Sequence, residues 1–435
     1  MAPWFRDGSL HFAVGIEDTF VPQEGVGRRK LDEYELTQHY HQWKDDLSRA
    51  ADAGAGMIRW GIPWYLVEPS PGTFDWEWTD RVVAHLSDLG LRCMVDLMHY
   101  GTPLWLDNQF LNHRYPDAVA AYAEAAAVRY RGVLDCWTPL NEPIINAVYC
   151  GEQGTWPPYL RGEDGFVKIV TQLAKGMVLT QQRIAAAQPE ATFVHVDAGF
   201  RWTGQWPAGA REHLEERRFL GLDLITGRVD ADHPMRDHLT AHGVTEAELA
   251  WFTENAVTPD VIGVNYYPAF TTAHRNAGTG ELTPEEAGTD GLVDLLHTYA
   301  TRYEQPLFLS ETSRGGSVEE RLAWLEESVA LVHRLREEGM PLVGYTWFPF
   351  FALVDWLYRE STEPVDRWLV QMGLYDLKRD AGAILRREPT ALVDRFRALA
   401  KDAQAKEAQT NDAQAKEAQT KEAQAPAPTD GTQTS

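Results

Sequence analysis

Residues 136–143 read CWTPLNEP, and residues 306–312 read PLFLSET. Each is a short, largely apolar run that ends close to a glutamate, Glu142 in the first and Glu311 in the second. Such runs are typical of strands that are buried on both faces of a parallel sheet. A carboxylate at the end of such a strand is costly unless it lies at the mouth of the sheet. We therefore expect both glutamates at the C-terminal ends of parallel strands.

Six similar apolar runs lie elsewhere in the chain, and amphipathic stretches separate most of the runs. Repeated alternation of strand and helix predicts parallel strands covered by helices, and eight such units close into a (β/α)8 TIM barrel, expected over residues 1–400. A doubly wound open sheet is the competing architecture, but no GxGxxG follows the first run. The other expected strands are 10–17, 57–62, 92–99, 192–200, 261–268 and 342–349, and expected helices include 78–89, 116–130, 166–188 and 318–338.

The two glutamates lie three strands apart in an eight-stranded ring, which predicts that they face each other across its opening. Cleavage of a glycosidic bond needs such a pair, with one group to protonate the leaving oxygen and another to attack or to activate water. The alternative is that each glutamate is a solvated strand end. That alternative would be preferred for either residue alone, but not for both in these contexts.

The motifs around both glutamates resemble those of glycoside hydrolase family 1, the β-glucosidase family, over most of residues 10–380. TPLNEP is similar to the family's Thr-x-Asn-Glu-Pro motif, which carries the acid/base. LSETS matches the nucleophile motif Thr-Glu-Asn-Gly only at the glutamate and its apolar approach. Further similar segments are 57–69, 97–103, 261–267, 344–356 and 372–375.

The resemblance implies a retaining β-glycosidase that needs no cofactor and acts on a small-molecule or oligosaccharide substrate. Glu142 would be the general acid/base and Glu311 the nucleophile, with the negative charge of Glu311 keeping Glu142 protonated. Arg59 would keep Glu311 ionised, and Tyr267 would donate to it. The other substrate-binding residues implied are Asn141 at the sugar 2-OH, His99 at another hydroxyl, Trp347 as a stacking floor, Asp355 at the outer hydroxyls, and Tyr100, Asn265, Trp356 and Glu17.

Three departures from the family pattern concern the sugar pocket. The N-terminal Gln-x-Glu-Gly is replaced by Gln23-Glu24-Gly25, His-Trp by His99-Tyr100, and Glu-Trp by Asp355-Trp356. Glu17 or Asp18 would then serve the far hydroxyls of the sugar. These departures indicate a divergent branch, or a neighbouring family of the same barrel clan. Transglycosylation by the same mechanism is one alternative function. A non-catalytic sugar-binding barrel is another, although it would be expected to lose a glutamate.

The charge, cysteine content and histidine content of the sequence limit the classes of macromolecule and metal that it is expected to bind. The formal net charge is −24, which disfavours nucleic acid and anionic membranes. Three cysteines without a CxxC argue against disulfides and zinc ribbons. The fourteen histidines include no HExxH, and we predict no metal.

The start of the chain lacks a signal pattern and no run approaches the ~20 apolar residues of a membrane helix, so we expect a cytoplasmic protein. Residues 401–435 repeat DAQAKEAQT without an apolar stripe, which predicts a disordered tail.

Overall fold

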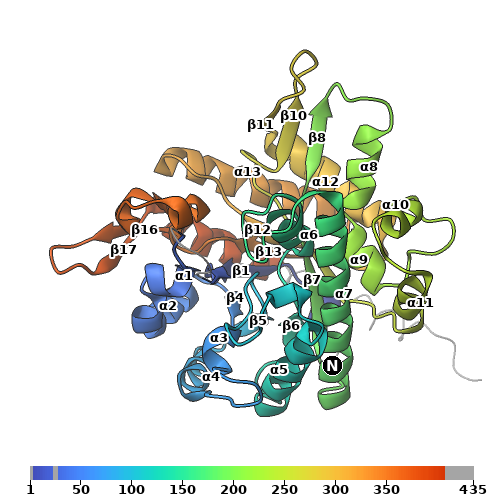
Figure 1. The fold of residues 1–435 in the computed structure, drawn as a ribbon. Helices are drawn as coiled ribbons and strands as arrows, with labels where there is room; N and C mark the ends of the chain where they lie inside the picture. The colour runs from blue at the N-terminus through green and yellow to red at the C-terminus, as the bar shows by residue number, and fades with distance from the viewer. Residues whose placement is uncertain (1–2, 23–27, 407–435) are drawn as a thin grey trace, which may run out of the picture.

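A computed structural model describes residues 3–22 and 28–406, and at its centre eight parallel strands close into a barrel (Figure 1). Each of the eight expected apolar runs supplies one barrel strand, so the predicted (β/α)8 fold is confirmed. In order around the barrel the strands are β1 (His11–Gly15), β13 (Leu342–Trp347), β12 (Leu307–Thr312), β9 (Val261–Asn265), β7 (Thr192–Ala198), β6 (Cys136–Thr138), β5 (Arg92–Asp96) and β4 (Met57–Gly61).

Helices surround the barrel, and the four predicted helical stretches correspond to α4, α5, α7 and α13. Local signals fix their ends: Ser317 and Glu320 form a capping box at the start of α13, and Gly90 ends α4 with a φ of 68°. The main helices are α2 (His39–Asp52), α4 (Glu77–Leu89), α5 (Tyr115–Arg129), α7 (Gly162–Ala187), α12 (Gly288–Arg302) and α13 (Val318–Glu337), with shorter α1 (Glu33–Leu36), α3 (Trp64–Val67) and α6 (Pro143–Ala147).

The interior of the barrel is a packed core, and the N-terminal segment closes it at one end. The short helix η1 (Trp4–Arg6) places Trp4 against Phe308 of β12, with their ring centroids 6.1 Å apart. The neighbouring β13 carries Gly344 beside this ring, where a Cβ atom would lie 1.9 Å from Phe308. Aromatic side chains therefore fill this end, which leaves the C-terminal ends of the strands for a site.

Several elements between and after the barrel strands were not expected from the sequence. Most lie between β7 and β12, at the right and top of Figure 1, and the last strand pair lies at the left. These elements are a sheet of β8 (Arg201–Gly204), β10 (Thr272–Arg275) and β11 (Leu282–Glu285); helices α8 (Ala210–Arg217), α9 (Leu220–Ile225), α10 (Arg236–Ala241) and α11 (Glu246–Glu254); and the strand pairs β2 (Phe20–Val21) with β3 (Leu31–Asp32), β14 (Leu353–Val354) with β15 (Leu369–Val370), and β16 (Tyr375–Arg379) with β17 (Leu385–Pro389).

The end of the barrel unit lies later in the chain than predicted. A helix runs over residues 391–406, and Ala403 on it is buried in the main core. This corrects the boundary expected at residue 401, because residues 401–406 continue a packed helix. Residues 407–435, which contain most of the predicted tail, lie outside the described residues, as do Gln23, Glu24 and Gly25.

Two further expectations concern cysteines and membranes. Cys93, Cys136 and Cys150 are all free and buried. Within the described part of the chain, no helix is long and apolar enough to cross a lipid bilayer.

Candidate active site

A cavity of about 670 Å³ opens at the C-terminal ends of the barrel strands, and both glutamates line it. Most of the residues predicted to bind substrate lie at this cavity, which brings together segments from β1 to β14. The predicted residues at the cavity are Glu142, Glu311, Glu17, His99, Tyr100, Asn265, Tyr267, Asp355 and Trp356. Arg59, Asn141 and Trp347 are buried and are not among the lining residues.

Glu142 follows β6 at the junction with α6. Its backbone has a φ of 46°, a left-handed conformation that non-glycine residues rarely adopt and that is common at functional sites. Two neutral groups donate to its carboxylate: the Tyr100 hydroxyl to Oε2, and the Asn265 amide to Oε1 at 2.8 Å. Burial and then the charge of Glu311 raise the pKa of Glu142 to about 7, against these hydrogen bonds. Burial is thus the larger cause, ahead of the glutamate pairing from which the sequence argument proceeded.

Glu311 lies on β12 just after a shift in strand register between Leu309 and Glu311. Arg59 on β4 donates to Oε1 and forms an ion pair with it, and the Tyr267 hydroxyl donates to Oε2 at 2.6 Å. Burial raises the pKa of Glu311, while Arg59, His99 and Tyr267 oppose that rise. The two carboxyls therefore differ in partner: Glu311 has a buried cation, whereas Glu142 accepts from two neutral donors.

Arg59 is fully buried and forms the base of the site. Besides Glu311 it pairs with Asp96 at the end of β5, where its terminal nitrogen lies 2.9 Å from Oδ2. It also donates to the Asn141 side-chain oxygen at 2.6 Å, and its guanidinium lies over the ring of Phe348, 5.4 Å from the centroid. These partners hold one guanidinium against two carboxylates, which orients Arg59 and keeps it charged.

A chain of hydrogen bonds connects Arg59 with Glu142 through Asn141. Since Arg59 only donates, the Asn141 oxygen faces it, and the amide nitrogen faces His99 Nε2 at 2.7 Å and the Tyr100 hydroxyl at 3.1 Å. The Tyr100 hydroxyl then donates to Glu142. Tyr100 is therefore a direct partner of the candidate acid, and not only a cavity wall as its predicted role in substrate binding suggested.

His99 and Asn265 are each oriented by a neighbour. His99 Nε2 lies 2.7 Å from the amide nitrogen of Asn141, and His99 Nδ1 lies 2.7 Å from Asp18 Oδ1. The Ser310 hydroxyl donates to the Asn265 side-chain oxygen at 2.7 Å, which turns the amide nitrogen of Asn265 toward Glu142. The register shift in β12 places Ser310 and Glu311, which are consecutive, in contact with this same network.

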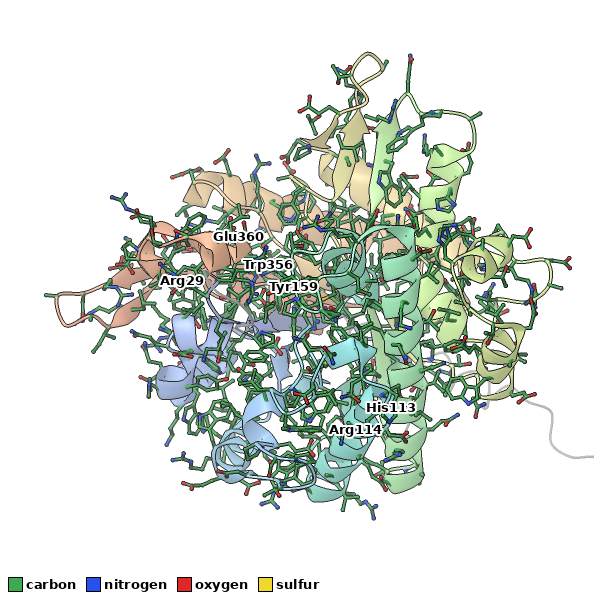
Figure 2. All side chains as sticks on the ribbon, in the orientation of Figure 1. Arg29, His113, Arg114, Tyr159, Trp356 and Glu360 are labelled. Atoms are coloured by element: carbon green, nitrogen blue, oxygen red, sulfur yellow. The ribbon has the colours of Figure 1, made fainter. Side chains whose placement is uncertain are left out.

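An aromatic wall lies beside Tyr100. Trp356, labelled in Figure 2, begins the short helix η4 (Trp356–Glu360). Its ring centroid lies 5.6 Å from that of Tyr100 and 5.0 Å from that of Trp156. Tyr149 packs on the same wall, 4.6 Å from Trp156. Asp355 precedes Trp356, and one of its carboxylate oxygens accepts the backbone N–H of Leu357 at 2.8 Å. Asp355 also lines the cavity.

Of two further predicted substrate-binding residues, Glu17 lines the cavity and Trp347 does not. Trp347 ends β13, is fully buried, and donates its indole N–H to the backbone oxygen of Met372 at 3.1 Å. Its role as a stacking floor for the sugar stays a prediction. The burial of Trp347 does not favour that role. Glu17 lines the cavity 3.7 Å from His99 Nε2, and Asp18 is the residue that bonds His99 directly.

Sequence reasoning did not identify several residues of this network. Asp96 could have been found, because it ends β5 directly before the motif segment 97–103 that contains His99. Ser310 adjoins Glu311, but only the register shift reveals its contact with Asn265. Tyr149 and Trp156 come from the segment after β6, where nothing in the sequence pattern shows which side chains face the barrel.

Chemically, this arrangement provides one carboxyl that readily carries a proton and a second that forms an ion pair with a buried cation. A sugar between them would meet a proton donor and a nucleophile or base. The lining side chains within the described residues include aromatic, amide and carboxylate groups. These groups suit a neutral molecule with many hydroxyls and an apolar face.

Known proteins resemble this chain in sequence and in fold. The family model described as Glycosyl hydrolase family 1 matches residues 13–362. Aryl-phospho-beta-D-glucosidase BglA of Bacillus subtilis strain 168 is 24% identical over 378 residues, covering 74% of this chain and 78% of that protein. Thermostable beta-glucosidase B of Thermobispora bispora is 24% identical over 371 residues, covering 74% of each chain.

Solved structures also resemble this chain in fold. Beta-glucosidase from Thermotoga maritima in complex with glucoimidazole superposes with a TM-score of 0.77 at 16% identity, covering 91% of this chain and 98% of that chain. At this identity the likeness shows the fold, and the family match carries the assignment. The family match spans most of the barrel and includes both glutamates. The chain therefore belongs to glycosyl hydrolase family 1 and is a glycoside hydrolase.

Proposed function

We propose that the protein hydrolyses β-linked glycosides with retention of anomeric configuration, with Glu142 as general acid/base and Glu311 as nucleophile. The observation that carries this proposal is the difference between the two carboxyl environments. Burial beside Glu311 raises the pKa of Glu142 to about 7, whereas Arg59 forms an ion pair with Glu311. A proton shared by the pair therefore resides on Glu142, which matches the division of labour in a retaining glycosidase.

The reaction would proceed in two displacements. Glu311 attacks the anomeric carbon while Glu142 transfers its proton to the leaving oxygen, so the glycosidic bond breaks and a glycosyl ester forms on Glu311. Glu142, now a carboxylate, removes a proton from water. That water attacks the anomeric carbon, releases the sugar, and restores both side chains.

Charge at the cavity favours an unphosphorylated sugar. Among the described lining residues the permanent cation is Arg359, and its guanidinium donates to the backbone oxygens of Val21 and Pro22. Glu17, Asp355 and Glu360 line the same cavity. A phosphorylated sugar, as in the names of some relatives, would meet three carboxylates and one guanidinium among these described lining residues. We therefore propose a neutral terminal sugar.

The leaving-group side of the cavity favours an apolar aglycone. Ile145 and Val148 lie on the segment after Glu142, and Phe270 and Leu357 are exposed at the rim. With the wall of Trp156 and Trp356, these side chains offer apolar surface beyond Glu142, where the leaving oxygen must lie. An aryl or alkyl group would bury its surface there.

The test is the stereochemistry of hydrolysis, followed by proton NMR on p-nitrophenyl β-D-glucoside. We expect the β-anomer to appear first, with mutarotation later. First appearance of the α-anomer would contradict the proposal. Parallel assays with the 6-phosphate of the same glucoside test the charge argument, which predicts a much lower kcat/KM for the phosphorylated substrate. A preference for the phosphorylated form would refute the neutral-sugar assignment while leaving the retaining mechanism intact.

A further inference from the structure

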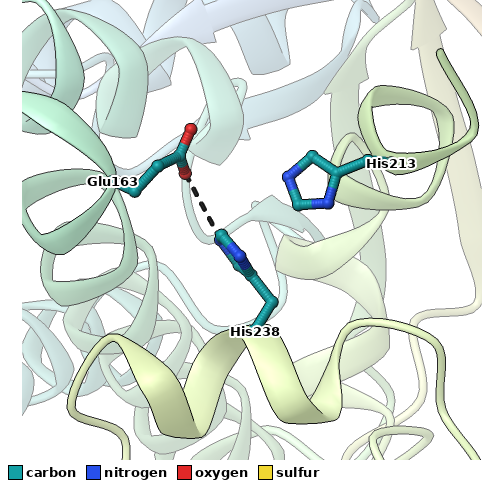
Figure 3. Close-up of side chains that lie close together, drawn as sticks. All are labelled: Glu163, His213 and His238. Carbon is teal, nitrogen blue, oxygen red and sulfur yellow. Dashed lines mark ion pairs between the residues drawn. The ribbon is translucent and has the colours of Figure 1, made fainter. Parts of the chain in front are cut away.

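A cluster of two imidazoles and a carboxylate lies away from the sugar cavity, where helices of the β7–β9 segment meet the start of α7. Glu163 is the second residue of α7, His213 lies on α8 and His238 on α10 (Figure 3). One ligand atom from each of the three residues lies within 4.8 Å of the others. We propose that these three side chains bind a divalent transition-metal ion of the zinc type.

The closest pair in the cluster has the spacing of two ligands on one ion. His238 Nε2 and Glu163 Oε2 lie 3.3 Å apart. Two ligand atoms each about 2.1 Å from a tetrahedral zinc ion are separated by about 3.4 Å. Both atoms are shielded from solvent, and apart from their ion pair with each other neither has a hydrogen-bond partner among the described residues. An ion between them would give each of these shielded atoms a coordination bond in place of that single contact.

The remaining atoms of Glu163 are already held in place. Arg217 donates to Glu163 Oε1 at 3.1 Å and also pairs with Glu152, which fixes the carboxylate and leaves Oε2 directed at His238. Metal-binding carboxylates are commonly fixed in this way by a second hydrogen bond. Glu152 offsets the positive charge of Arg217, so the negative charge of Glu163 remains for a cation.

The rings of the two histidines lie close to each other. The rings of His213 and His238 have centroids 4.6 Å apart at 74°, and the ring of His213 has no hydrogen-bond partner in the described chain. The ring of His242, one turn further along the chain, lies 4.4 Å from that of His238 between their centroids. Rotation of the His213 side chain would close the third contact.

Two imidazoles and one carboxylate select zinc-type ions over magnesium and calcium, which prefer all-oxygen sites. The ion would connect α8 and α10, two helices of the segment outside the barrel, to α7 on the barrel itself. Since the ligands lie 50 and 25 residues apart in sequence, no short motif could reveal them, which is why the sequence analysis predicted no metal. The other described cluster, Asp18, Asp96 and His99, is already occupied by Arg59 and internal hydrogen bonds.

The proposal is tested by calorimetric titration of ZnCl₂ into the full chain, free of any tag and stripped of metal with EDTA, at pH 7.5. Wild type should bind one ion tightly. His238→Ala and His213→Ala should each weaken binding at least about ten-fold, since even residues that only orient a metal ligand cost that much. His274→Ala is the matched control, because His274 pairs with Glu285 at 3.1 Å on an exposed sheet without a third ligand. It should bind zinc like wild type.

Zinc should also raise the melting temperature of wild type by about 2–5 °C and that of His238→Ala by much less. Circular dichroism and melting of each variant in EDTA check that it folds. Anomalous diffraction at the zinc edge should place the ion among Glu163, His213 and His238. Zinc binding that is unchanged in both histidine variants, no binding by wild type, or an anomalous peak only elsewhere would overturn the proposal.

Discussion

The hydroxyl of Tyr100 should set the pH at which Glu142 acts as an acid. This hydroxyl donates to Glu142 Oε2 and lowers the pKa of Glu142, which nevertheless stands near 7 because of burial and the charge of Glu311. A hydrogen bond to a charged group contributes about 1.5–3 kcal/mol, and one pKa unit corresponds to about 1.4 kcal/mol. Tyr100→Phe removes this bond while keeping the ring, so the pKa of Glu142 should rise by about 1–2 units.

The assay is the pH dependence of kcat/KM with a β-glycoside whose leaving group is poor and needs protonation. The alkaline limb reports loss of the proton from Glu142 in the free enzyme. Its midpoint should lie near pH 7 in wild type and about 1–2 pH units higher in Tyr100→Phe. Tyr149→Phe is the control, because Tyr149 lies on the same aromatic wall and is not a hydrogen-bond partner of Glu142 in the described chain.

The result that would refute this reasoning is an alkaline limb in Tyr100→Phe that coincides with that of wild type. A uniform loss of kcat/KM at every pH would show that the hydroxyl only positions Asn141, to which it is also bonded. A shift of similar size in Tyr149→Phe would assign the effect to the aromatic wall and not to the hydrogen bond.

Three further predictions concern Glu311, Glu142 and the end of the chain. Glu311→Ala should be nearly inactive and regain turnover with azide as an α-glycosyl azide; a β-azide product would remove Glu311 from the nucleophile role. Glu142→Gln should increase the free energy of unfolding in urea by up to about 3 kcal/mol at pH 8, because it removes a buried carboxyl whose pKa rises from 4.5 to about 7 on folding. That gain should shrink from pH 7 to 4.5 and vanish below, and equal gains at pH 4 and 8 would contradict it. Removal of residues 407–435 should leave the melting temperature unchanged, whereas removal of 403–435 should lower it by taking buried Ala403 from the core. Equal melting temperatures of the two deletion variants would show that the folded barrel does not end between residues 403 and 407.

The barrel and the positions of Glu142 and Glu311 at its mouth were predictable because they rest on patterns that are local in sequence. A short apolar run of this kind is typical of a strand that is buried on both faces of a parallel sheet. A carboxylate at the end of such a strand indicates that this end lies at the open end of the barrel. This reasoning located Glu142 and Glu311 at one cavity. Arg59 and Tyr267 reached Glu311 as expected, although their placement came from the family resemblance and not from spacing.

Other features depend on geometry that the pattern does not contain. Tyr100 has a φ of 78°, and Glu142 one of 46°, and these left-handed turns bring the Tyr100 hydroxyl to the carboxylate. Trp347 follows the same strand pattern as a mouth residue but is buried. The cluster at Glu163 joins three helices whose packing no periodicity reveals.

The central claim is that Glu311 forms a covalent bond to the sugar. Incubation with 2,4-dinitrophenyl 2-deoxy-2-fluoro-β-D-glucoside, followed by peptic digestion and tandem mass spectrometry, tests it most directly, because the fluorine slows release of the glycosyl ester. The account predicts one fluoroglucosyl group per chain, located on Glu311, with Glu311→Gln unlabelled. A label on Glu142 or on any other residue, or full turnover without any labelled enzyme, would contradict it.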